Sequence, residues 1–155
     1  MRKTLCCAAL ATAALLTAAT ARADCDCPQV SLDERIAGAT VIFSGRPLMN
    51  AQIPAGSSPF HSEQSLEQPG GMQYDLITLF QVDTIWKGKA TPRIKIRHER
   101  GACGADFEPD VPVIVFAEAD DTGIFWTRAC NGNATSGDGA YETLKQGLTN
   151  RIRYN

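Results

Sequence analysis

Five segments of this chain carry the apolar, β-branched and aromatic residues that predict β-strands. In RIKIRH, at Arg93–His98, apolar and polar residues alternate strictly, so one face is predicted to be buried and the other solvated. The longest segment, from Gln73 to Trp86, is apolar on both faces, because Ile77 and Leu79 lie opposite the face that holds Phe80. The predicted strands are Thr40–Leu48, Gln73–Trp86, Arg93–His98, Val111–Ala117 and Ile124–Ala129.

Two helices are predicted to flank the strands. Ser31-Leu32-Asp33-Glu34 is a capping box, which predicts a short helix that ends near Gly38. The second helix is predicted over Gly139–Arg153, where apolar residues recur at helical spacing: Tyr141, Leu144, Leu148 and Ile152. Five strands with a leading and a terminal helix are typical of a small closed or partly open barrel, so the predicted fold class is mainly β.

The segments between the strands contain the residues of turns and loops. Gly45 predicts a bulge or bend inside the first strand. Asn50–Gly71 is rich in Pro, Gly, Ser and Gln, which predicts a long mobile loop or an elaborated hairpin. Asp120-Asp121-Thr122-Gly123 predicts a hairpin turn between the last two strands.

The first 23 residues have the pattern of an export signal. Arg2 and Lys3 precede the apolar run Leu5–Ala19, and Ala21-Arg22-Ala23 has the form of a cleavage site. The alternative, a membrane anchor, is disfavoured because the run is short and rich in Ala and Thr, whereas a span needs about 20 strongly apolar residues. The prediction is therefore a cleaved signal peptide over 1–23, followed by one domain over 24–155 that is secreted or periplasmic and has no membrane anchor.

Charge disfavours nucleic acid as a partner. The chain has 15 Lys and Arg against 17 Asp and Glu, and the leader contains three of the basic residues but no acid. The formal charge of the mature chain is therefore 12 minus 17, or −5. Binding to a phosphate backbone needs a positive surface, so no nucleic-acid partner is expected.

Four cysteines remain after the leader: Cys25, Cys27, Cys103 and Cys130. In an exported chain, an even number of cysteines predicts disulfides, here two. Three pairings are open, and the bond between Cys25 and Cys27 is disfavoured because it would close a very tight ring. The alternative is a four-thiolate metal site, but C-x-C is a poor match to the usual zinc spacing.

The order of short motifs resembles that of the tissue inhibitors of metalloproteinases. Cys-x-Cys-Pro stands at the mature start, followed by VIFSG, a long strand that ends IWKG, then ACG, and a late Cys-Asn-Gly. The chain is most similar to short, bacterial-type, single-domain members with a netrin-like module. The resemblance implies a five-stranded barrel of the oligonucleotide/oligosaccharide-binding (OB) type, with the disulfides Cys25–Cys103 and Cys27–Cys130.

The resemblance also implies a function for the mature N-terminus. In the animal inhibitors, the amine and carbonyl of the first cysteine chelate the zinc of a metalloendopeptidase, and the next side chain enters the adjacent specificity pocket. The corresponding residues here are Cys25 and Asp26, flanked by Asp24, Cys27 and Pro28. This chain departs from the family in that the predicted cleavage leaves Asp24 ahead of Cys25, and Asp26 brings a carboxylate to the pocket.

Basic residues on and near one strand suggest a second binding function. Arg93, Lys95 and Arg97 share one face of the predicted Arg93–His98 strand, and Lys87 and Lys89 precede it. The alternatives are a solvated outer face and a stripe that binds a polyanion. If the stripe is a binding site, the protein is predicted to be a non-inhibitory interaction module of the cell envelope or matrix, which binds a protein or a polyanion.

No catalytic pattern stands out in the sequence. His61 and His98 lie in unrelated contexts, and a Cys/His nucleophile pair would need a free thiol, whereas all four cysteines are expected to be bonded. We therefore expect a binding protein, not an enzyme, with no cofactor and no metal of its own.

Overall fold

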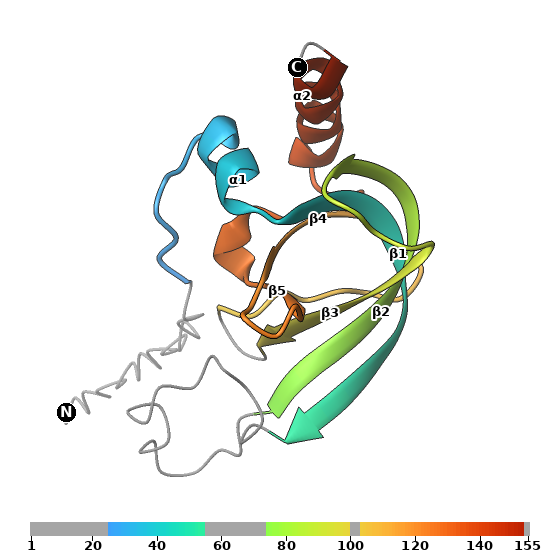
Figure 1. Cartoon of the computed structure of the whole chain (residues 1–155). Coiled ribbons are helices and arrows are strands. Elements are labelled where there is room, and N and C mark those ends of the chain that lie inside the picture. The colour runs from blue at the N-terminus through green and yellow to red at the C-terminus, as the bar shows by residue number, and fades with distance from the viewer. Residues whose placement is uncertain (1–24, 55–73, 100–102, 154–155) are drawn as a thin grey trace, which may run out of the picture.

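The strands close into a five-stranded barrel. A computed structural model describes residues 25–54, 74–99 and 103–153, and their course is shown in Figure 1. The strands are β1 (Val41–Pro54), β2 (Tyr74–Lys87), β3 (Arg93–Glu99), β4 (Val113–Ala119) and β5 (Phe125–Thr127). Neighbours follow the order β1-β2-β3-β5-β4, and the pairing of β1 with β4 closes the ring. Only β3 and β5 run parallel among these pairs. The predicted mainly β, OB-type barrel is therefore confirmed.

Strand β1 bends where the sequence predicts. Its first residues pair with β4, whereas the strand as a whole pairs with β2, and the β1–β2 register shifts between Ser44 and Gly45. A Cβ atom at Gly45 would lie 2.4 Å from the backbone oxygen of Gln81. Glycine is therefore required here because β2 approaches closely, and the bend lets β1 pair with both β2 and β4.

Strand β1 is longer than predicted. It extends past Leu48 to Pro54, and its last residue pairs with Tyr74 of β2. Residues Asn50–Pro54 therefore agree with the predicted elaborated hairpin and not with the alternative, a loop. Because the partner strand supplies backbone hydrogen bonds, this polar, weakly patterned segment is held in an antiparallel ribbon. The rest of the predicted loop lies outside the described residues, as do the predicted signal peptide and Asp24.

The last part of the sheet also differs from the prediction. Strand β4 begins at Val113 instead of Val111, and β5 has three residues instead of six. The chain then forms a 3-10 helix, η3 (Ala129–Asn131), and a short strand β6 (Ala134–Thr135), which pairs with β4. Between them, the side chain of Asn133 accepts from the backbone N–H of Phe116 and donates to the carbonyl of Arg128. These contacts from an amide side chain turn the chain away from the strand that the apolar pattern predicts.

Both predicted helices are present. Helix α1 (Leu32–Gly38) begins at the Ser31–Glu34 capping box, and α2 covers Ala140–Arg153. Figure 1 shows the two helices at the same end of the barrel. Of the predicted apolar stripe of α2, Tyr141 and Leu148 are buried, whereas Ile152 in the last turn is 40% exposed.

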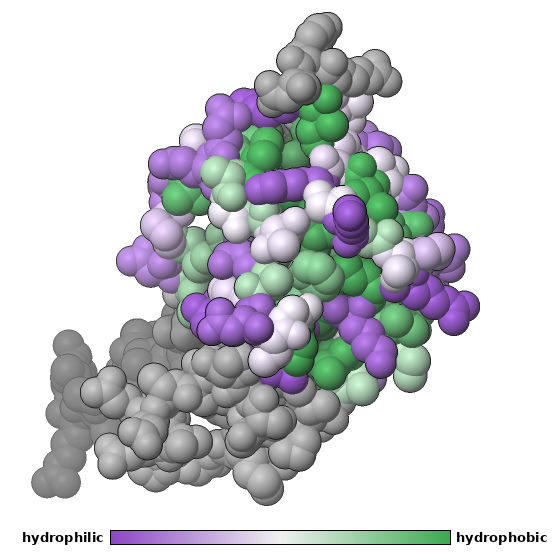
Figure 2. All heavy atoms as spheres, in the orientation of Figure 1, coloured by the Kyte–Doolittle hydropathy of each residue, from purple (hydrophilic) through white to green (hydrophobic). Residues whose placement is uncertain are grey.

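The core has two parts, one inside the barrel and one beneath the helices. Inside the barrel, Phe80 makes edge-to-face contacts with Phe43 and Phe107, at centroid distances of 5.5 and 5.0 Å. The second cluster includes Trp86 and Leu148 and joins the barrel to the helices. Apolar side chains also reach the surface between hydrophilic ones, as Figure 2 shows for one face. The interior of the barrel is thus filled by side chains.

One polar network lies within the barrel wall. His98 is 1% exposed, and its Nε2 atom lies 2.7 Å from the hydroxyl of Thr78, which itself donates to the side chain of Asn50. Because the single hydroxyl proton is used toward Asn50, Thr78 accepts a hydrogen bond from His98 Nε2. His98 is therefore a core residue bonded across the β2–β3 pair.

Candidate functional site

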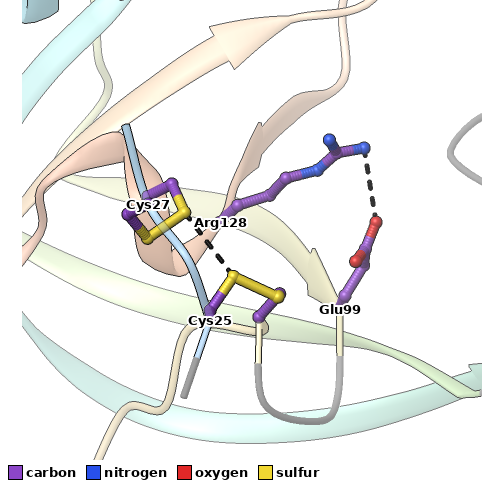
Figure 3. The surroundings of a disulfide bond; sticks show 6 residues. Cys25, Cys27, Glu99 and Arg128 are labelled. Atoms are coloured by element: carbon purple, nitrogen blue, oxygen red, sulfur yellow. Dashed lines mark hydrogen bonds and ion pairs between the residues drawn. A yellow bond between two sulfur atoms is a disulfide. The ribbon is translucent and has the colours of Figure 1, made fainter. Parts of the chain in front are cut away.

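Two disulfides hold the start of the described chain against the barrel. Cys25 is bonded to Cys103, and Cys27 to Cys130, with Cα–Cα distances of 5.0 and 5.1 Å (Figure 3). These are the same pairs that the family resemblance implies.

The geometry of this disulfide cluster follows from the extended segment that carries it. Residues 25–30 have no regular secondary structure, and side chains two residues apart on an extended chain point to the same side. Cys103 lies in the connection that follows β3, and Cys130 lies in η3. The N–H of Ala129 donates to the carbonyl of Cys103 at 3.1 Å, which ties the two attachment points together. As a result, the Sγ atoms of Cys25 and Cys130 are only 3.6 Å apart.

The pinned segment presents a polar and an apolar side chain to solvent. Asp26 and Pro28 are exposed, whereas Cys25 and Cys27 are half-buried. The disulfides therefore fix the backbone of the segment and leave the side chains between and after the cysteines accessible to a partner.

An ion pair flanks the disulfide cluster. Arg128, two residues before Cys130, reaches the carboxylate of Glu99 at 3.3 Å, as Figure 3 shows. The guanidinium of Arg128 also lies over the ring of Trp126, 4.9 Å from its centroid. These contacts connect β3 to the segment that leads from β5 into η3, and so brace the attachment point of Cys27.

Three of the sulfur atoms are close enough to suggest a metal site, but they are disulfide sulfurs and not the thiolates that bind a metal. Those of Cys25, Cys27 and Cys130 lie within 4.8 Å of one another. A metal ion binds thiolates, and all three sulfurs are consumed in disulfides. In this oxidised form the cluster is a covalent staple.

The predicted basic residues occupy different environments. The ammonium of Lys87 donates to the carbonyls of Ile36 and Ala37, at 2.6 and 3.2 Å, and so caps the C-terminal end of α1. Lys89, Arg93 and Lys95 are exposed, whereas Arg97 is 8% exposed. Arg93, Lys95 and Arg97 lie along one groove, and Lys87 is bound to the helix instead.

This groove, called here the β2–β3 groove, combines cationic and apolar side chains. Its volume is about 580 Å³, within the range of small-molecule sites. Among the residues that line it are Ile77, Leu79, Arg93, Lys95, Arg97 and Ile124. Sequence reasoning assigned the cations to a binding stripe but did not assign the aliphatic residues to a site. The available signal was that β2 is apolar on both faces, since a barrel strand with a packed interior needs only one apolar face.

The two histidines do not assemble a site among the described residues. His98 is in the core, and His61 lies outside the part of the chain that the structure describes. The predicted contact residue Asp24 likewise lies outside it.

No protein-family model and no curated protein matches this chain. None of the helices within the described residues is long and apolar enough to cross a membrane. Disulfides persist in oxidising compartments, so the two bonds are compatible with an exported protein.

Proposed function

We propose that this chain is an exported, non-catalytic binding protein that inhibits a zinc metalloendopeptidase by docking its pinned Cys25–Pro28 segment at the protease zinc. The observation that supports the proposal is the disulfide cluster, which fixes this segment through Cys25 and Cys27 while Asp26 and Pro28 stay exposed. A segment that is ordered before it binds does not have to be ordered by the target, so less of the binding free energy is lost.

The chemistry of the proposed inhibition depends on where the mature chain begins. A free α-amine and the carbonyl of the same residue form a bidentate chelator, and the amine titrates at about 7.7–8.0 when unperturbed. A chain that begins at Cys25 places this chelator on the pinned residue. A chain that begins at Asp24 places the free amine one residue earlier, ahead of the residue that the disulfide fixes.

Asp26 sets the specificity of the proposed contact. Its side chain is exposed, and on docking it would enter the pocket beside the zinc. A carboxylate that enters an apolar pocket loses hydration at a high cost, whereas a threonine brings a methyl group and a hydroxyl instead. Asp26→Thr is therefore expected to tighten inhibition of proteases with apolar pockets.

The first experiment is the intact mass of the exported protein before and after reduction, which gives both the N-terminal residue and the number of disulfides. The oxidised protein is then titrated into zinc endopeptidases that carry the H-E-x-x-H motif. The proposal predicts that a chain that begins at Cys25 inhibits at least one protease of the panel. One alanine added ahead of Cys25 should abolish this inhibition, and Asp26→Thr should strengthen it. The matched control is Asp83→Thr, an exposed acid on β2, which should change nothing. If no member of the panel is inhibited by the chain that begins at Cys25, the proposal is wrong.

A second candidate is a non-inhibitory interaction module of the envelope or matrix, in which the disulfides are purely structural. The observation that favours it is the exposure of Lys89, Arg93 and Lys95 on the outside of the barrel. Binding of a polyanion to these residues should weaken steeply with salt, and Arg93→Glu combined with Lys95→Glu should abolish it. Retention of polyanion binding by this double variant would exclude the stripe as the site.

A further inference from the structure

The β2–β3 groove is built from rows that place an aliphatic side chain beside a cationic one. In the antiparallel register, Leu79 of β2 pairs with Lys95 of β3, and Ile77 pairs with Arg97. Residues directly opposite in such a pair project to the same side of the sheet. Over these two rows the outer surface is therefore apolar on β2 and basic on β3, whereas Arg93 pairs with the polar Gln81.

The turn between β4 and β5 adds to the apolar part of the groove. Ile124, at the end of this turn, lines the groove together with Phe125 and is 39% exposed. The turn is held by Asp120, whose carboxylate accepts from the N–H of Thr122 and the N–H of Ile124, at 2.8 and 2.9 Å. The exposed isoleucine is thus carried by an ordered turn beside the two rows.

The available positive charge lies mainly on two residues. Arg93 and Lys95 are exposed, and no acidic residue in the described ranges forms an ion pair with either of them. Asp120 interacts electrostatically with Arg97, so this carboxylate offsets part of the charge of Arg97. A negatively charged ligand would therefore be held chiefly by Arg93 and Lys95.

The groove favours a ligand that needs no backbone partners. Beneath the aliphatic side chains, β2 is paired on both sides, with β1 and with β3, so it offers no free edge to a peptide at Ile77 and Leu79. Strand β3 pairs with β5 only at Arg97 and His98. A peptide laid over Ile77 and Leu79 would bring N–H and C=O groups that lose water and find no partners. A polyanion would cover the same aliphatic side chains with charged groups. An alkyl chain has no polar groups to desolvate and matches the apolar row.

We propose that the β2–β3 groove binds a free single-chain anionic amphiphile, with its alkyl chain along Ile77, Leu79 and Ile124 and its carboxylate or phosphate at Arg93 and Lys95. The inference deepens the second candidate function, because it uses the same basic strand, and it is independent of protease inhibition. It differs from polyanion binding in requiring the aliphatic residues of the groove.

The test is calorimetric titration of the full, oxidised protein with octyl, decyl and dodecyl phosphate, each below its micellar concentration. A fully buried methylene contributes about 0.8 kcal/mol, so affinity is expected to rise about two- to fourfold for each added methylene. Dodecyl trimethylammonium, which has the same chain and the opposite charge, is expected to bind at least about tenfold more weakly than dodecyl phosphate.

Two substitutions and two matched controls locate the site. Ile124→Ser and Lys95→Glu should each weaken dodecyl phosphate binding by about five- to tenfold. Ile85→Ser and Lys145→Glu change exposed residues that do not line the groove, and they should leave the affinity unchanged. Circular dichroism and the intact mass confirm that each variant is folded and oxidised.

The outcomes separate this inference from the broader proposal. Affinity that is independent of alkyl length, or equal for both head-group charges, overturns it. Binding of heparin that is weakened by both Lys89→Glu and Lys95→Glu, without dodecyl phosphate binding, overturns it too and supports the polyanion stripe. Binding to anionic phospholipid vesicles without binding of the monomeric amphiphile would assign the face to a membrane surface and likewise refute the inference.

Discussion

The two disulfides share one three-residue segment, so each one shortens the loop that the other closes. Taken alone, the bonds span sequence separations of 78 and 103 residues. The chain-entropy model assigns loops of these lengths about 4.5 and 4.7 kcal/mol at 25 °C. When the other bond is intact, the remaining loop runs along the 2 residues from Cys25 to Cys27 and the 27 from Cys103 to Cys130. A loop of about 29 residues is worth about 3.6 kcal/mol in the same model.

Removal of either disulfide alone is therefore expected to lower the free energy of unfolding by the same amount, about 3.6 kcal/mol. Loss of packing adds little, because Cys103 is exposed and the other three cysteines are only half-buried. Removal of the second bond then costs the full value for its own loop, so both together cost more than the sum of the single removals. Natural domains are stable by about 5–15 kcal/mol, so removal of both bonds can unfold the protein. The comparison is therefore made on the variants that keep one disulfide.

The assay is urea denaturation of the paired variants Cys25→Ala/Cys103→Ala and Cys27→Ala/Cys130→Ala, followed by tryptophan fluorescence. Equal midpoint shifts at equal m-values are expected, since both variants close one long loop in place of two. A difference of more than about 1 kcal/mol between the two variants, or a cost below about 1.5 kcal/mol for either, would refute the shared-loop reasoning. The control is the double mutant Asp26→Ala/Pro28→Ala, which alters the same segment without changing any loop.

Three further predictions follow from single positions in the barrel. Gly45→Ala places a Cβ atom 2.4 Å from the backbone oxygen of Gln81, so overpacking should cost about 1–3 kcal/mol in urea unfolding, and a cost near zero would mean that β2 can move aside. Thr78→Val leaves buried His98 without its hydroxyl partner, which should cost about 1–3 kcal/mol in the same assay, whereas a change below about 0.5 kcal/mol would show that the bond contributes little. The pKa of the Asp120 carboxyl is lowered in the folded protein, first by the hydrogen bond from the Thr122 side chain. The stabilisation by the ionised carboxylate is therefore present above the unfolded pKa, near 4, and is lost as pH falls through the lower folded pKa. Melting temperatures measured from pH 6 to pH 2 should therefore differ between wild type and Asp120→Ala at high pH and converge at low pH; a constant difference would contradict this assignment.

Local patterns in the sequence were sufficient to predict the elements whose causes are local. The Ser31–Glu34 capping box satisfies its own backbone groups within four residues, so α1 begins where the sequence predicts. The strict alternation of Arg93–His98 likewise predicts β3, because a period of two separates a buried from a solvated face within one strand. Gly45 could be recognised as a bend because glycine inside a strand marks close approach of another backbone.

The tertiary structure decided the features that depend on a partner far away in the sequence. Strand β1 continues to Pro54 because β2 supplies its hydrogen bonds, although the residues after Leu48 carry little strand pattern of their own. Conversely, the apolar pattern after Ile124 predicts a six-residue strand, but Asn133 binds the backbone of β4 and the chain leaves the sheet after Thr127. Side-chain hydrogen bonds of this kind compete with the strand ladder, and their partners cannot be read from spacing.

The candidate sites divide in the same way. The sequence by itself predicted two bonds among the four cysteines after the leader, and it predicted that β3 would present basic residues on one face. Only the folded barrel brings Cys103 and Cys130 to the same place, and only the β2–β3 register sets Leu79 beside Lys95. The physical reason is that residue type and period fix which side a residue faces, whereas strand pairing fixes what it faces.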